Sequence, residues 1–210
     1  MNAGVVTRER PGWLDSTPLV RVSVAASVWG VAYGAYRGYY ALGGTLGMVG
    51  AYSSPAVWRS INAAGAAALL VAAAVPVAAL WLSRRRVARA VLLVLFSIAA
   101  VGLVMHALID EVQRLLSLTG LAARWHLSLP ATSTAGWLWK DQHASDLQDV
   151  LLNEPWFLVE GLLCATVVWL ALGPGTTRRR WLAGSLVAVA ACVAFGLLTA
   201  LGVVPRAIVL

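Results

Sequence analysis

The stretch SRRRVARAVLLVLFSIAAVGLVMHALID, residues 83–110, decides the fold. It opens with a cluster of arginines and then runs through residues 90–109 with no acidic residue, lysine or arginine. A helix of about 20 apolar residues crosses the roughly 30 Å hydrocarbon core of a bilayer. The stretch therefore predicts a transmembrane helix that begins beside a basic loop.

Four more charge-poor runs of similar length flank this one. The chain of 210 residues is 60% hydrophobic and 12% charged, with a mean hydropathy of +0.78, which is too apolar for one water-soluble domain. The sequence predicts an all-α integral membrane protein with a cytoplasmic segment 1–17 and a single transmembrane domain 18–210. The five spans are expected at residues 18–42, 60–83, 90–110, 155–172 and 181–205.

Arginine clusters predict the orientation of the chain in the membrane. Arg84, Arg85 and Arg86 separate the second and third spans, and residues 178–180 separate the fourth and fifth. Because cytoplasmic loops carry an excess of Arg and Lys, both loops are expected inside the cell. An odd number of spans then places the N-terminus inside and the C-terminus outside.

The outer loop, residues 111–153, is too long for a plain connector and is expected to carry structure. Asp141 can cap an amphipathic helix whose polar residues, Asp146 and Asp149, lie opposite an apolar face. That apolar face consists of Ala144, Leu147, Val150 and Leu151. We expect this helix to lie along the membrane surface.

Small residues form a stripe on the first span. Gly30, Gly34 and Gly38 repeat every fourth residue, so one face of the helix is nearly bare backbone. Another helix can approach such a face closely. The stripe indicates either a homodimer seam or packing within the bundle, and the second is favoured because four other spans need neighbours.

A few polar residues within or beside the spans are candidate site residues. His106, Asp110 and Arg114 share a helix face at four-residue spacing, which allows either proton transfer between His and Asp or an ordinary surface ion pair. Glu160 is costly to leave ionised and alone in a membrane. We expect Arg37 to pair with it, with His106 nearby, although Arg37 could instead reach the headgroups. The predicted site is an outward-facing polar pocket of Arg37, His106, Asp110 and Glu160.

The sequence predicts no metal site and no cofactor. The outer loop contains His126, His143, Asp141 and Asp146, but none of them has a tight metal-ligand spacing. Intramembrane haem needs two facing histidines, and only His106 lies at membrane depth.

The net charge of +7 does not indicate a nucleic-acid partner. The basic residues sit in short clusters at the ends of apolar runs, where they set topology, and not on a recognition face. The expected partners are membrane lipids and either a second copy of the chain or another membrane protein.

Two segments, YYALGG at residues 39–44 and NEPWFLVEG at residues 153–161, carry a resemblance to a known family. At these segments the chain resembles small actinobacterial multi-pass membrane proteins with a domain of unknown function. The resemblance covers roughly the first four spans and implies a bacterial plasma membrane. It implies no activity, substrate or catalytic residue.

Three classes of function fit these features. The favoured one is a non-enzymatic membrane component that binds a ligand or partner at the outward-facing pocket. The alternative is a membrane-embedded enzyme acting on a lipid or isoprenoid-like substrate, with His106 and either Asp110 or Glu160 as acid and base and Arg37 holding an anionic group. The second alternative is a channel or transporter subunit, in which Glu160, Asp110 and His106 line a proton or cation path.

Overall fold

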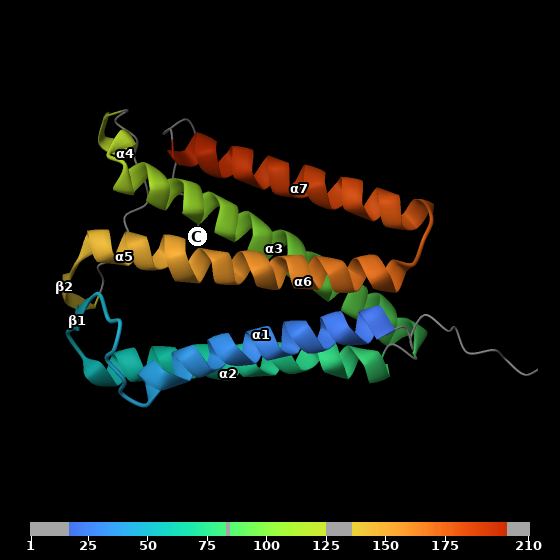
Figure 1. Ribbon diagram of the computed structural model, residues 1–210, viewed down its shortest axis with the longest axis horizontal. Helices are drawn as coiled ribbons and strands as arrows, with labels where there is room; N and C mark the ends of the chain where they lie inside the picture. Colours follow the sequence, from blue (N-terminus) through green and yellow to red (C-terminus); the bar gives the residue numbers. More distant parts are fainter. Residues whose placement is uncertain (1–16, 83–84, 125–135, 201–210) are drawn as a thin grey trace, which may run out of the picture.

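A computed structural model describes residues 17–82, 85–124 and 136–200 of the chain (Figure 1). Within these residues, five helical segments are long and apolar enough to cross a membrane. The prediction of an all-α protein with five such helices is confirmed. The helices are α1 (Thr17–Ala41), α2 (Pro55–Leu82), α3 (Arg86–Leu118), α6 (Glu154–Leu172) and α7 (Thr176–Ala200).

The five long helices form two packed groups that run along a common direction (Figure 1). Helices α1 and α2 form an antiparallel pair, α3 lies against α6, and α7 packs on the outer side of α3. Contacts between α1 and α6 join the two groups. A buried apolar core crosses this junction and consists of Leu19, Ala79, Phe96, Ala100, Cys164, Val167 and Val168.

At one end of the bundle, arginines cluster where α2 is followed by α3 and where α6 is followed by α7. The Arg89 guanidinium at the start of α3 donates a hydrogen bond to the Ala171 carbonyl near the end of α6, at 2.9 Å. Arg178 at the start of α7 lies over the ring of Trp169, 3.5 Å from its centroid. We call this the arginine end, and define it by the loop and helix-start residues Arg85, Arg86, Arg89, Arg178, Arg179 and Arg180.

The opposite end carries a small sheet and several short helices. Strand β1 (Gly50–Tyr52) pairs antiparallel with β2 (Trp137–Lys140), which connects segments far apart in the sequence. Helix α4 (Leu121–Arg124) also lies there. We call this the strand end, and it includes the described part of the predicted outer loop.

Glycines on α1 allow the close approach of α2. A Cβ atom added at Gly30 would lie 2.9 Å from the Ala73 Cβ, and one added at Gly34 would lie 3.0 Å from a Leu70 methyl carbon. Nothing among the described residues lies within 4 Å of such an atom at Gly38. These distances favour packing within the bundle for Gly30 and Gly34, whereas Gly38 takes no part in this contact.

The expected outer loop does carry structure in its described part, but its first boundary needs a correction. Helix α3 continues to Leu118, well past the predicted end of the third span at residue 110. The amphipathic helix is present as α5 (Gln142–Gln148), and the Asp141 side chain caps it by accepting a hydrogen bond from the Ala144 N–H at 3.0 Å. A single turn of π-helix, η1 (Asp149–Asn153), joins α5 directly to α6.

This helix follows the direction of α6, and its placement along a membrane surface stays a prediction. Helix α5 extends α6 along the same axis, as Figure 1 shows. Its polar face points into the protein, because Asp146 is buried against α3 while Leu151 in the following turn is 73% exposed. The extension of α3 supplies the partners that draw this polar face inward.

Three helices begin several residues earlier than predicted, and one of them is α3, which begins at Arg86 and not at residue 90. Helix α2 begins at Pro55, before residue 60, and α7 begins at Thr176, before residue 181. Residues 201–205, the predicted end of the fifth span, lie outside the described residues. No residue in the range 176–199 is buried, so α7 is a peripheral helix of the bundle.

Candidate functional site

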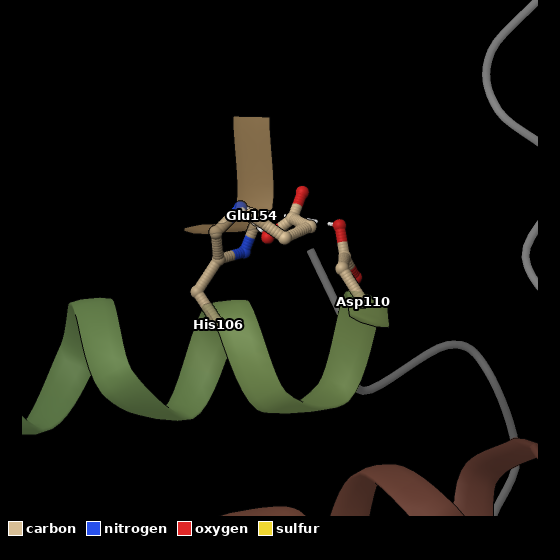
Figure 2. Close-up of side chains that lie close together, drawn as sticks. All are labelled: His106, Asp110 and Glu154. Atoms are coloured by element: carbon tan, nitrogen blue, oxygen red, sulfur yellow. Dashed lines mark ion pairs between the residues drawn. The ribbon is translucent and has the colours of Figure 1, made fainter. Parts of the chain in front are cut away.

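A cluster of one histidine and two carboxylates lies near the strand end, between α3 and α6. His106 and Asp110 project from neighbouring turns of α3, and Glu154 comes from the first turn of α6 (Figure 2). His106 Nε2 lies 3.9 Å from Asp110 Oδ2 and 3.9 Å from Glu154 Oε2. The side chains of His106, Asp110 and Glu154 are 47%, 27% and 5% exposed, so the cluster has one open and one buried side.

Glu154 is the buried member of this cluster. Its Oε2 atom is enclosed and has no hydrogen-bond partner within the described structure. Pro155 occupies the first turn of α6, where its missing N–H is tolerated. The preceding π turn, η1, inserts a residue into the helix and so changes which face the following side chains occupy.

A second cluster of polar side chains, at the strand end, joins α3 to α5 and η1. Arg114 on α3 lies between two acids, with Nε 3.2 Å from Asp149 Oδ2 and a terminal nitrogen 3.7 Å from Asp146 Oδ1. Asp146 also accepts hydrogen bonds of 2.7 Å from the Ser117 hydroxyl and from the Gln142 amide. These contacts hold α5 and η1 against α3, and we call this group the Arg114 network.

The sheet places a cationic side chain near the Arg114 network. Burial lowers the pKa of Lys140 in β2, while the nearby acids Asp149 and Asp146 oppose that shift. The Lys140 Nζ lies 5.8 Å from the centroid of the Trp137 ring. Lys140 thus adds positive charge beside the Asp146 and Asp149 carboxylates.

An apolar cavity of about 280 Å³ lies between α1, α2, α3 and α6. Glu160 is the only charged residue in its lining, and its Oε2 atom is enclosed without a hydrogen-bond partner in the described structure. The Tyr33 hydroxyl donates a 3.4 Å hydrogen bond to Asn153 Oδ1. The other lining residues include Gly30, Leu69, Pro76, Phe96, Leu103 and Phe157.

Aromatic residues separate this cavity from the histidine cluster. Phe157 lines the cavity and meets the His106 ring edge to face, with ring centroids 5.2 Å apart. Trp156 also lines the cavity and stacks on Trp29 at 4.4 Å and on Tyr33 at 5.3 Å. The two candidate sites therefore share a wall but have different chemistry.

The structure does not gather the four predicted pocket residues in one place. His106 and Asp110 are neighbours, whereas Glu160 faces the apolar cavity. Arg37 donates a 3.2 Å hydrogen bond to Asn62 Oδ1 on α2. The expected Arg37–Glu160 ion pair does not occur among the described residues, because the close packing of α1 on α2 places the buried Asn62 amide beside Arg37.

Sequence reasoning did not include Glu154 in the site. Its position before Pro155 indicates only a helix start, and its proximity to His106 depends on how α6 packs against α3. The spacing of His106 and Asp110 was the available signal, since both lie on the same face of one helix.

No family model, curated protein or solved structure matches this chain. The resemblance stated on the sequence segments therefore stays a prediction. The two sites are interpreted from their own geometry. The cavity suits an apolar molecule with one polar group, and the histidine cluster suits a positively charged species.

Proposed function

We propose that this chain is a membrane protein that binds a lipid-like ligand in the cavity between α1, α2, α3 and α6. The observation that carries the proposal is an apolar cavity of about 280 Å³ whose lining contains one charged residue, Glu160. Ligand sites in proteins are mostly apolar, with a few placed polar groups, and measure about 300–1,000 Å³. At about 280 Å³ the cavity lies just below that range, a size that suits an acyl or isoprenoid chain.

The environment of Glu160 indicates what the ligand carries besides its apolar chain. An enclosed carboxylate oxygen without a hydrogen-bond partner is unfavourable in an apolar environment. A ligand hydroxyl or amino group placed next to Glu160 would donate the missing bond. The proposed ligand is therefore an amphipathic molecule with a hydrogen-bond donor near its chain.

Binding is favoured over catalysis by the arrangement around the cavity. Acid–base catalysis requires a group within about 2.6–3.2 Å of the proton it transfers, and usually a second group to complete the reaction. Glu160 is the only charged residue of the described lining, and the Phe157 ring lies between the cavity and His106. The enzyme hypothesis therefore has a single candidate group at the cavity.

The ligand proposal is tested by filling the cavity. Ala99 on α3 lines it, so Ala99→Phe should exclude the ligand, whereas Ala90→Phe places the same side chain at an exposed position of α3. The measurement is mass spectrometry of lipids that copurify with the full chain in mild detergent. We expect one lipid class to be enriched with wild type and Ala90→Phe and depleted with Ala99→Phe. Equal lipid content in all three proteins contradicts the proposal.

We further propose that the arginine end faces the cytoplasm of a bacterial cell and the strand end faces outside. Support comes from the clustering of Arg85, Arg86, Arg89 and the residues at 178–180 at one end. The test first replaces the native Cys164 and Cys192 by Ala. A single cysteine is then introduced at an exposed position of each end, either Thr177 at the arginine end or His143 at the strand end. A membrane-impermeant maleimide added to intact cells should label only the cysteine at 143. Labelling only at 177 contradicts the orientation.

A further inference from the structure

The cluster of His106, Asp110 and Glu154 lies outside the ligand cavity, and the proposed function does not use it. One ligand-type atom from each residue, His106 Nε2 and a carboxylate oxygen of Asp110 and of Glu154, lies within 4.8 Å of the other two. Figure 2 shows the three side chains close together, with the Glu154 carboxylate between the His106 ring and the Asp110 carboxylate in this view. We propose that these three residues bind a divalent transition-metal cation.

The buried carboxylate is the independent sign of a missing partner. The Glu154 side chain is only 5% exposed, and its Oε2 atom has no hydrogen-bond partner in the described structure. His106 Nε2 is the nearby nitrogen, but 3.9 Å is too long for a hydrogen bond. A cation between the two atoms would satisfy both.

The distances are compatible with a bound cation after a small movement of side chains. A cation with bonds of about 2.0–2.2 Å in tetrahedral geometry holds its donor atoms roughly 3.4 Å apart. His106 Nε2 lies 3.9 Å from each carboxylate oxygen, so rotation of the side chains closes the site. The Phe157 ring against His106 limits the orientation of the imidazole.

The donor set selects the class of cation. One imidazole nitrogen with two carboxylate oxygens suits Zn²⁺, Mn²⁺ or Fe²⁺, whereas Mg²⁺ and Ca²⁺ prefer oxygen ligands throughout. Asp149 and Glu111 add negative charge around Glu154, which Arg114 partly offsets. The half-exposed His106 leaves the open side of the site accessible to water as a further ligand.

The test is calorimetric titration of the full chain with ZnCl₂, and separately with MgCl₂. The protein is purified in mild detergent with a tag that contains no histidine and is first treated with EDTA. We expect one equivalent of Zn²⁺ to bind at least tenfold more tightly than Mg²⁺, and the melting temperature to rise with added Zn²⁺. Absence of Zn²⁺ binding, or equal affinity for both cations, overturns the proposal.

Variants assign the binding to these residues. Loss of an outer-shell partner alone lowers metal affinity about 10–100-fold, so His106→Ala and Glu154→Gln should each lower Zn²⁺ affinity by at least tenfold. His143→Ala removes an exposed histidine of α5 and should bind Zn²⁺ as wild type does.

Asp110→Asn keeps the test valid if Glu154→Gln fails to fold, because Asp110 is the more exposed carboxylate of the cluster. It should fold, elute as a single species and lose the thermal shift with Zn²⁺. An undiminished shift in this folded variant, or equal losses in His106→Ala and His143→Ala, contradicts the site.

Discussion

The two glutamates of α6 lie in different environments on the same helix. Glu154 faces His106 and Asp110 near the strand end, while Glu160 faces an apolar cavity. At the 1.5 Å rise of an α-helix, about 9 Å along the axis separates them. The same functional group thus suits two kinds of proposed ligand, a cation where other donors lie close by and a hydrogen-bond donor where apolar side chains surround it.

The contrast extends to what holds each region together. At the strand end, charged and polar side chains join α3 to α5 through the Arg114 network. Around the cavity, Gly30 and Gly34 on α1 let side chains of α2 approach the α1 backbone closely. The strand end should therefore be most sensitive to the loss of a charge, and the cavity region to a change in side-chain volume.

The largest effect is expected from Arg114→Met. This change leaves the buried Asp146 without its cationic partner, and breaking a buried ion pair costs about 3–5 kcal/mol. The free energy of unfolding should fall by this amount, measured as thermal or denaturant stability in detergent. Adding Asp146→Asn should restore part of the loss, because it removes the unpaired charge.

The control for this prediction is Arg124→Met. Arg124 ends α4 at the same end of the bundle but is exposed, so its replacement should change stability by less than about 0.5 kcal/mol. If both arginine variants lower the free energy of unfolding equally, the total charge of the strand end affects stability and the specific contacts of the Arg114 network do not.

An intermediate effect is expected where α1 packs on α2. Gly30→Leu forces a large side chain against Ala73, and overpacking costs about 1–3 kcal/mol. Gly38→Leu is the matched control, since a Cβ atom added there meets nothing within 4 Å. Melting temperatures of the two variants should differ clearly. Similar losses at both positions would show that Gly38 also contacts a neighbour, such as a second copy of the chain.

Hydropathy and charge were enough to predict the five long helices, because a membrane-spanning helix depends mainly on the apolar length of its own segment. Residues 90–109 indicate a span by apolar length alone, and the described structure has a helix there. The extension of α3 to Leu118 was not predictable in this way. Its last turns carry charged and polar residues, whose helical state depends on partners in α5.

The candidate site depends on contacts between distant segments, which spacing cannot supply. His106 and Asp110 could be paired from the sequence because they lie one turn apart on a single helix. Glu154 joins them only through the packing of α6 on α3. Glu160 and Arg37 were expected to meet because each is costly alone in a membrane, but a buried amide, Asn62, is a closer partner for Arg37.

The smallest effect separates these two possible partners of Arg37. The hydrogen bond from Arg37 to Asn62 predicts coupling between them, whereas Glu160 lies in the cavity lining without a bond to Arg37. In a double-mutant cycle of Arg37→Gln and Glu160→Gln, the two stability changes should add to within about 0.5 kcal/mol. The cycle of Arg37→Gln with Asn62→Ala should instead show a coupling of more than about 0.5 kcal/mol, with an upper limit of about 3 kcal/mol for a hydrogen bond to a charged group. Both cycles are measured as thermal unfolding of the full chain in the same detergent.

Coupling in the first cycle and additivity in the second would mean that Arg37 reaches Glu160 across the cavity. The cavity would then hold an ion pair, and its single carboxylate would not be free to anchor a ligand.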